Sequence, residues 1–406
     1  MPRLLALNNY YYRRGGSEAV YFEHNRLFEE AGWEVVPFSM QNALNLPTPW
    51  STHFIPDTDS ARSPWAKVGR AADTIYSLPA ARRIRRLLAL ARPDIAHAHN
   101  IYHHLSPSVL VELHRRDIPV VLTLHDLKLV CPAYKMHTQG AICEACRGGA
   151  LRNVVKNRCI RDSTAMSALV WLESTVHRMS DVYERNVSRF VVPSRFFGSK
   201  LADWGVDTRK FSYVPNSIDV EAFEPTHESG DGFVYLGRLV VEKGVATLIR
   251  AAAKAAVRLR IVGTGPEEAS LRRLAAELGG EVEFTGYLSG AALRAAVTSA
   301  RAVVIPSEWY ENAPISVMEA SALARPIIGA DVGGIPELIV AGETGFVFKS
   351  GDVDSLVAVL SQVQSLPQER LRQLGTAGRD LMRTAFSPSL YRERMLKLYE
   401  EIGVIH

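Results

Sequence analysis

Long hydrophobic runs are absent from this sequence of 406 residues. A membrane-spanning helix needs about 18 or more consecutive apolar residues, and no stretch of the chain approaches that length. The apolar start at residues 1–7 is also shorter than the hydrophobic region of a secretory signal peptide. These absences predict a protein of the cytoplasm.

Cysteine is scarce, and its four copies fall in one segment with the spacing C-x11-C-x2-C-x12-C. Disulfides are rare in the cytoplasm, whereas the C-x2-C step suits a tetrahedral metal. We therefore expect a structural zinc site, with an iron–sulfur cluster or free thiols as the alternatives. The residues concerned are Cys131, Cys143, Cys146 and Cys159, and we interpret 131–159 as an insertion beside the active cleft.

Excess charge of either sign is small, because the net charge is only +4. It is distributed unevenly: residues 1–200 hold 26 Lys+Arg against 17 Asp+Glu (+9), and residues 201–406 hold 21 against 26 (−5). The basic run at 82–86 predicts an amphipathic helix that rests on an anionic membrane surface or is simply solvated. Because the run contains no aromatic residues and no nucleic-acid module is visible, nucleic acid is not expected as a partner.

The length exceeds that of one ordinary core and predicts two domains. Strand-like and helical segments alternate in both halves, which indicates an α/β fold with parallel sheets. We expect an N-terminal domain at 1–205, a C-terminal domain at 206–385, and a last helix at 386–406 that returns to the first domain.

The clearest chemistry follows an apolar strand that ends at Ile305. We predict a helix with Asn312 as its N-cap and Pro314 in its first turn. The amides of Ile315, Ser316 and Val317 lack intrahelical partners at such a helix start and are predicted to form an anion site, most naturally for phosphate.

Two carboxylates, Glu311 and Glu319, flank this anion site. Carboxylates repel phosphate, so their expected work is to accept hydrogen bonds from hydroxyl groups. A nucleotide-activated sugar carries a diphosphate between two polyhydroxylated groups and fits both features. The alternative is that the glutamates are surface charges that favour the helix dipole.

Further candidates follow other predicted strands. Arg238 and Lys243 come after the strand at 233–236 and are suited to phosphates. His125 follows the strand at 119–124, where ligands of open α/β sheets gather. Alternation predicts that His97 and His99 point to the same side of another strand.

Two glycine motifs complete the pattern. Gly15 and Gly16, after Arg13 and Arg14, precede a helix and allow a ligand to approach the backbone. The stretch from Gly263 to Gly265 hints at a nicotinamide cofactor, but Glu268 replaces the third glycine of that fingerprint. Tyr287 is expected to offer its ring to a nucleobase.

Together these motifs resemble the retaining glycosyltransferases of family four, whose GT-B fold has two facing Rossmann-like domains and a deep cleft between them. The resemblance covers almost the whole chain and includes the E-x7-E element. Its motifs are Gly15-Gly16, His125, Pro215-Asn216-Ser217, Gly237-Arg238-Leu239 with Lys243, Gly263-Thr264-Gly265-Pro266, Glu311 to Glu319, and Gly333-Gly334-Ile335-Pro336-Glu337.

The resemblance implies a nucleotide-sugar donor, of UDP or GDP type, and catalysis without a divalent metal. Arg238 and Lys243 would hold the diphosphate, Glu319 the ribose and Glu311 the donor sugar. His125 would lie beside the anomeric carbon. Further donor contacts would come from Gly15, Gly16, Gly263, Tyr287 and the amides of 312–316, and the acceptor side would include Arg13, Arg14, His99, Asn100 and His125.

The expected acceptor is a growing polysaccharide or a lipid-linked oligosaccharide at the inner face of the membrane. Three other functions stay open: a nucleotide-sugar epimerase of the same fold, an NAD-linked oxidoreductase, and a catalytically silent partner protein. The intact cations and glutamates disfavour the silent protein.

Overall fold

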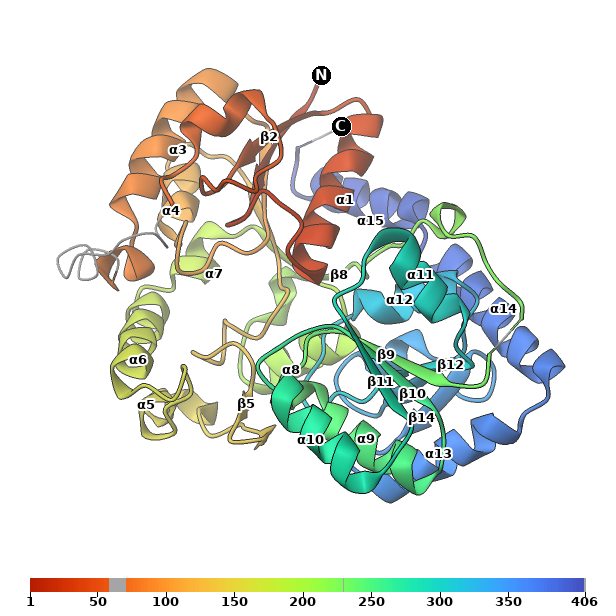
Figure 1. Cartoon of the computed structure of the whole chain (residues 1–406). Helices are drawn as coiled ribbons and strands as arrows, with labels where there is room; N and C mark the ends of the chain where they lie inside the picture. The colour runs from red at the N-terminus through yellow and green to blue at the C-terminus, as the bar shows by residue number, and fades with distance from the viewer. Residues whose placement is uncertain (58–70, 229, 405–406) are drawn as a thin grey trace.

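Two six-stranded parallel sheets form the frame of the molecule (Figure 1). The computed structural model describes residues 1–57, 71–228 and 230–404. The strand order is β2-β1-β3-β4-β7-β8 in the first sheet and β11-β10-β9-β12-β13-β14 in the second. The chain completes one sheet before it starts the other, which confirms the predicted α/β class with two parallel sheets.

The strands are short and mostly buried. β3, β4, β12 and β13 are buried along their whole length, as expected for parallel strands that helices cover on both faces. The first sheet contains β1 (Arg3–Leu7), β2 (Glu34–Phe38), β3 (Ile95–Ala98), β4 (Val120–Thr123), β7 (Arg189–Val192) and β8 (Phe211–Tyr213). The second contains β9 (Phe233–Leu236), β10 (Leu259–Val262), β11 (Val282–Gly286), β12 (Ala302–Ile305), β13 (Ile327–Ala330) and β14 (Gly345–Phe348).

The helices cover both faces of each sheet. Around the first sheet are α1 (Gly16–Glu30), α3 (Leu78–Ala91), α4 (Ser108–His114), α5 (Asn153–Lys156), α6 (Thr164–Met179), α7 (Val182–Asn186) and α8 (Arg195–Asp203). Around the second are α9 (Val245–Lys254), α10 (Glu268–Leu278), α11 (Gly290–Thr298), α12 (Ile315–Ala322), α13 (Val353–Ser365) and α14 (Gln368–Ala385). No described helix combines the length and apolar composition needed to cross a bilayer.

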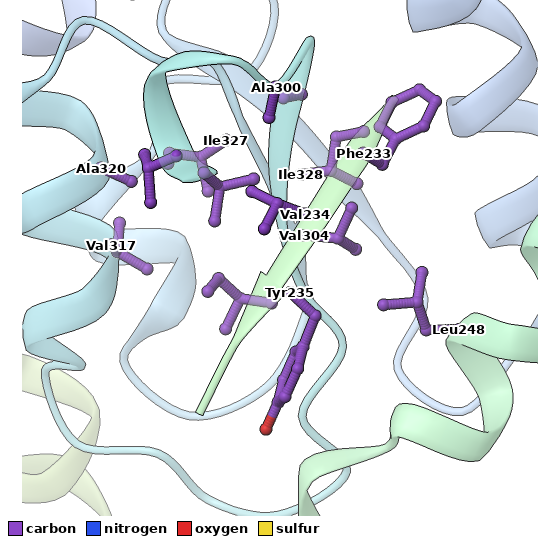
Figure 2. Packing of buried hydrophobic residues seen from close by; sticks show 14 of the residues in the cluster. Phe233, Val234, Tyr235, Leu248, Ala300, Val304, Val317, Ala320, Ile327 and Ile328 are labelled. Carbon is purple, nitrogen blue, oxygen red and sulfur yellow. The ribbon is translucent and has the colours of Figure 1, made fainter. Parts of the chain in front are cut away.

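The second sheet has its own hydrophobic core. Figure 2 shows Phe233, Val234 and Tyr235 of β9 among side chains from neighbouring strands and from helices α9 and α12. All three are at most 2% exposed. Because α12 packs on this core through Val317 and Ala320, its start is held rigidly at the edge of the sheet.

The last helix, α15 (Pro388–Glu401), leaves the second domain and packs against α1 of the first (Figure 1). Its buried residues Tyr391, Met395, Leu398 and Tyr399 share a cluster with Leu4, Leu27, Phe28, Trp33 and Ile95. The first sheet extends to β8, which pairs with β7 beyond residue 205. The two domains are therefore joined both at the chain crossing and through α15.

The cysteine segment also reaches the second domain. It contains a small antiparallel hairpin of β5 (His137–Thr138) and β6 (Ala141–Ile142). Lys135 forms an ion pair with Glu242 at 2.5 Å, and the Tyr310 hydroxyl donates to Glu144 Oε1 at 2.8 Å. The insertion thus lies beside the inter-domain cleft, as the sequence predicts.

Candidate functional site

Each sheet has a topological switch point at which its strand order reverses. It lies between β1 and β3 in the first sheet and between β9 and β12 in the second. Ligands of open α/β sheets bind at the carboxyl ends of the strands beside such a point. His99 and Asn100 follow β3, Arg238 follows β9, and the segment that leads to Glu311 follows β12. The fold therefore gathers most of the predicted residues at these edges.

The N-termini of α1 and α12 meet across the cleft. A side-chain carbon at Gly16 would lie 3.6 Å from the Ile315 side chain, so the two helix starts are in contact distance. Gly15 has an extended backbone, with φ −167°, and no atom crowds either glycine. Since neither conformation nor packing requires glycine here, the missing side chains leave the helix ends open to a ligand. Two positive dipole ends in one place favour an anion.

The predicted cap of α12 is wrong. Pro314 occupies the N-cap position, and no side chain caps the helix. Asn312 instead crosses to the first domain, where its Nδ2 donates to the Leu124 carbonyl at 2.8 Å and its Oδ1 accepts from Ser194 Oγ at 2.9 Å. A sequence pattern cannot distinguish these uses of Asn312, because both hydrogen-bond partners belong to distant segments.

The anion site at the start of α12 is smaller than predicted. The amide of Val317 donates to the Pro314 carbonyl at 3.1 Å. The amides of Ile315 and Ser316, in the first turn, have no intrahelical acceptor. The carbonyl of Ala313 accepts from Asn216 Nδ2 at 3.2 Å, which ties the loop before the helix to the crossing between the domains.

Glu311 is buried beside a cation. Its carboxylate is bonded to Lys243 Nζ at 2.6 Å and to Ser307 Oγ at 2.7 Å. Burial raises the pKa of Glu311, but the Lys243 ammonium and the two hydrogen bonds outweigh burial and leave the pKa below its ordinary value. Glu311 is therefore ionised at neutral pH. The sequence analysis did not assign Ser307 to the site, although its position just after the end of β12 could have indicated it.

The second glutamate has a different environment. Glu319 is half-buried, and its carboxylate accepts no hydrogen bond from the described residues. Burial raises its pKa. It lines a cavity of about 230 Å³ together with Ile315 and with Arg13 and Val20 of the first domain. Glu319 is thus an available acceptor for hydroxyl groups inside the cleft.

Arg238 is exposed and forms no ion pair with the described part of the chain. Its loop is shaped by the glycine motif after β10. A side-chain carbon at Gly263 would lie 1.9 Å from the Gly237 carbonyl oxygen, and one at Gly265 would lie 2.2 Å from that of Leu239. These glycines therefore let two loops pack backbone to backbone, which explains a G-x-G pattern without a nicotinamide cofactor. Tyr287, at the next strand end, is 75% exposed.

On the first domain, His125 is partly exposed and follows the Leu124 carbonyl that Asn312 contacts. His99 lies behind it with 1% exposure, so in this conformation it contacts His125 rather than the solvent of the cleft. His97 and His99 stack at 4.8 Å, which confirms that they point to the same side. Asn100 is bonded through its backbone to the loop after β1.

The two arginines before α1 lie differently. Arg13 borders the cavity, whereas the Arg14 guanidinium stacks over the Tyr10 ring at 4.4 Å.

The four cysteines are all unpaired, with Cys131 and Cys146 buried. Burial, followed by repulsion from the other three thiolates, raises the pKa of Cys146 to about 12. Within the described residues, however, no group of three or more His, Cys, Asp or Glu side chains has an arrangement that could hold a metal ion. The zinc site stays a prediction.

Comparison with known families decides the assignment. The family described as "Glycosyltransferase Family 4" matches residues 14–222, just over half of the chain. The chain belongs to glycosyltransferase family 4. A second family, "Glycosyl transferases group 1", matches residues 220–381 and so covers the second domain of this family 4 protein.

Curated relatives match the family 4 protein over part of their length. It is 31% identical over 178 residues to an alpha-D-kanosaminyltransferase of Streptomyces kanamyceticus, which covers 42% of this chain and 46% of the relative. It is 30% identical over 215 residues to a GDP-mannose-dependent monoacylated alpha-(1-6)-phosphatidylinositol monomannoside mannosyltransferase of Corynebacterium glutamicum, which covers 47% and 56%. The chain thus spans about half the length of the curated relatives it matches.

Solved structures support the fold over the whole chain. The sucrose-phosphate synthase of Thermosynechococcus elongatus has a TM-score of 0.73 at 20% identity and covers 99% of both chains. Anabaena Alr3699/HepE, solved in complex with UDP and glucose, has a TM-score of 0.71 at 14% identity and covers 99% of this chain and 100% of that one. At these identities the likeness concerns the fold, and the predicted GT-B architecture is confirmed.

Proposed function

We propose that this family 4 protein is a retaining glycosyltransferase that moves a sugar from a UDP- or GDP-type donor to a saccharide acceptor. The observation that carries the proposal is that the starts of α1 and α12 meet beside a cavity lined by Glu319, while the ion pair of Lys243 and Glu311 lies in the segment just before α12. The names of its relatives and neighbours, which include nucleotide-sugar-dependent transferases and a complex with UDP and glucose, support this reading.

The proposed roles follow from the local chemistry. Arg238, exposed and without an ion-pair partner, would bind the donor diphosphate together with the amides at the start of α12. Lys243 would share its ammonium between Glu311 and the leaving phosphate and so stabilise the charge that develops there. Glu319, with no protein donor of its own, would accept from the ribose hydroxyls.

Glu311 would hold the donor sugar, and closure of the cleft would exclude water. In front-face transfer the acceptor hydroxyl attacks from the side on which the phosphate leaves, so the sugar keeps its anomeric configuration, and the leaving phosphate helps to accept the proton of the hydroxyl. Cations supply the charge stabilisation in this scheme, and no catalytic divalent metal is invoked. An epimerase of the same fold would use the same donor contacts but convert the nucleotide sugar into its epimer without a sugar acceptor, so the product distinguishes the two functions.

The first test is a thermal-shift panel of UDP, GDP, ADP, CMP, dTDP and NAD without added metal. A ligand at about 100 times its dissociation constant adds about 2.7 kcal/mol of stability. We expect a shift with one nucleoside diphosphate that is lost in Arg238→Ala and kept in the control Arg294→Ala, an exposed arginine on α11. A shift with NAD alone would overturn the proposal.

A second test separates the glutamates. Glu319→Ala should weaken nucleotide binding, whereas Glu311→Ala should chiefly lower turnover. Glu277→Ala, at an exposed position on α10, is the matched control. Equal nucleotide affinity of wild type and Glu319→Ala would contradict these roles, and donor binding without transfer to any acceptor would favour a silent partner protein.

We also propose that the cysteine segment binds a structural zinc ion. The support is the C-x2-C spacing, which suits a tetrahedral metal. The protein purified without chelator should contain about one zinc per chain by mass spectrometry of the elements, and Cys143→Ser with Cys146→Ser should lose it. Zinc content that is absent from wild type, or unchanged in the double variant, would refute the site.

Finally, we propose that the protein rests on the inner face of the membrane through its first domain, where a lipid-linked acceptor would be found. The predicted basic helix, α3, buries its apolar residues Ile84, Leu87 and Leu88 and exposes its arginines together with Leu78 and Leu90 near its two ends. An apolar stripe is available on α6, where exposure is 38–81% at Trp171, Leu172, Val176 and Met179. Both helices lie at the same outer side of the first domain (Figure 1).

Co-sedimentation with vesicles tests this association. Binding should require anionic lipid, weaken with salt, and fall in Leu172→Glu but not in Leu278→Glu, an exposed leucine on α10 of the second domain. Binding that is independent of α6, or absent at low salt, would contradict the proposal.

A further inference from the structure

Four histidines form a continuous row in the first domain. The ring centroids are 4.3 Å apart for His24 and His97, 4.8 Å for His97 and His99, and 5.1 Å for His99 and His125. The first three are at most 1% exposed, whereas His125 is partly exposed. His24 also borders the cavity that Glu319 lines. The row therefore connects the interior, near α15, with the candidate site.

The contact at the cleft end is a hydrogen bond between two imidazoles. His99 Nδ1 and His125 Nε2 are 2.9 Å apart. Burial lowers the pKa of both rings, that of His125 to about 4, so both are neutral near pH 7. One nitrogen must then donate and the other accept.

The unpaired atom of His99 indicates the direction. His99 Nε2 is buried and has no hydrogen-bond partner among the described residues. If His125 donated, the proton of His99 would lie on this nitrogen as a buried N–H without an acceptor, which is rare in proteins. The favoured arrangement therefore has His99 donating through Nδ1–H.

We propose that His99 is a positioning residue that holds His125 in the Nδ1–H tautomer. The bond engages His125 Nε2, and His125 makes no other hydrogen bond to the described residues. Its Nδ1–H is thus available to donate to a sugar hydroxyl or a phosphate oxygen in the cleft, and the ring is not poised as a base. The role of His125 as a donor to the substrate rests on the proposed function, whereas the assignment of its tautomer does not.

Among the described residues, neither His99 nor His125 forms an ion pair or a hydrogen bond with a charged side chain. His99 is flanked by His97, by His24 at 5.6 Å and by the Tyr21 ring at 5.3 Å. His97 is satisfied separately, through Nδ1 to the Tyr399 hydroxyl and through Nε2 to Thr123 Oγ1, both at 2.7 Å. The hydrogen bond from His99 is therefore the contact that orients the His125 ring.

Long-range 1H–15N spectra of the full chain with 15N-labelled histidine report the tautomer directly. We expect the proton of His125 on Nδ1 in wild type and in His99→Asn, whose amide nitrogen can take the place of Nδ1–H. His99→Leu should lose this preference. The matched control His24→Asn removes another buried imidazole of the row without touching the bond and should leave His125 unchanged.

Kinetics supply a second readout. His99→Leu should lower kcat by about 10- to 100-fold with little change in donor KM, as for other residues that orient a site through a second side chain, and His99→Asn should restore most of it. Observation of His125 with its proton on Nε2 in wild type overturns the proposal even if His99→Leu fails to fold. If no donor supports transfer, the proposed function fails while the spectra still decide the tautomer.

Discussion

The buried histidines predict that the first domain loses stability in mild acid. Burial lowers the pKa of His24 from 6.5 to about 3 and that of His125 to about 4, and it holds those of His97 and His99 well below the ordinary value. In the unfolded chain these rings become protonated near pH 6.5. Their contribution to stability is therefore fully present above that pH and is lost as the pH falls toward the folded-state values.

The magnitude follows from linkage. At about pH 5, relative to about pH 8, His24 and His125 each lower the free energy of unfolding by about 2 kcal/mol. Asp126 has the opposite effect, because burial raises its pKa to about 6 and the folded state therefore binds a proton at a higher pH than the unfolded state does. This difference raises the free energy of unfolding by about 1 kcal/mol at about pH 5. The net loss from His24, His125 and Asp126 is therefore about 3 kcal/mol, and burial of His97 and His99 adds to it in the same direction.

Urea unfolding followed by tryptophan fluorescence at both pH values measures this loss. His24→Gln should reduce the difference between the two pH values by about 2 kcal/mol, whatever it does to stability at pH 8. His114→Gln, at an exposed position on α4, is the control and should not change the difference. A wild-type difference below about 1 kcal/mol would refute the reasoning, because even one ring kept neutral should produce that much after the opposing contribution of Asp126.

Two further predictions concern buried contacts. Lys128→Met should lower the free energy of unfolding in urea by about 3–5 kcal/mol. The reason is that the Glu173 carboxylate, whose side chain is 1% exposed, would lose the ammonium that lies 2.6 Å away, and changing both residues to Met should recover much of the loss. Gly263→Ala should lower the free energy of unfolding by about 1–3 kcal/mol, because the new carbon would overlap the Gly237 carbonyl oxygen and Gly263 has a φ of +137°. The same change should weaken nucleotide binding by moving the loop that carries Arg238. An alanine variant with unchanged stability would contradict this packing role.

The sequence predicted the segments that matter at the site because they follow strand ends. Apolar runs of β type, such as the one that ends at Ile305, are recognisable locally, and the residues after them reach the carboxyl edge of a parallel sheet. Lys243 and Glu311 were both identified in this way, and the structure joins them in an ion pair. Their assignment to one cleft depended on the family resemblance.

The partners of individual polar side chains could not be predicted. Asn312 has the sequence context of a helix cap, yet its amide bonds to Leu124 and Ser194 of the other domain. His99 looked like a residue of the acceptor side, but it is 1% exposed and packs against Tyr21 and His24 of α1. Both outcomes depend on segments that are far apart in the chain.

Local patterns by themselves determined the α/β class, the glycine-rich helix starts and the identity of the charged residues, because hydrophobic period and backbone requirements act over a few neighbours. Tertiary structure alone decided which charges pair, which histidines are buried and which glycines serve packing. Those choices depend on the distances and water exposure that arise only when two sheets face each other and α15 closes over the first.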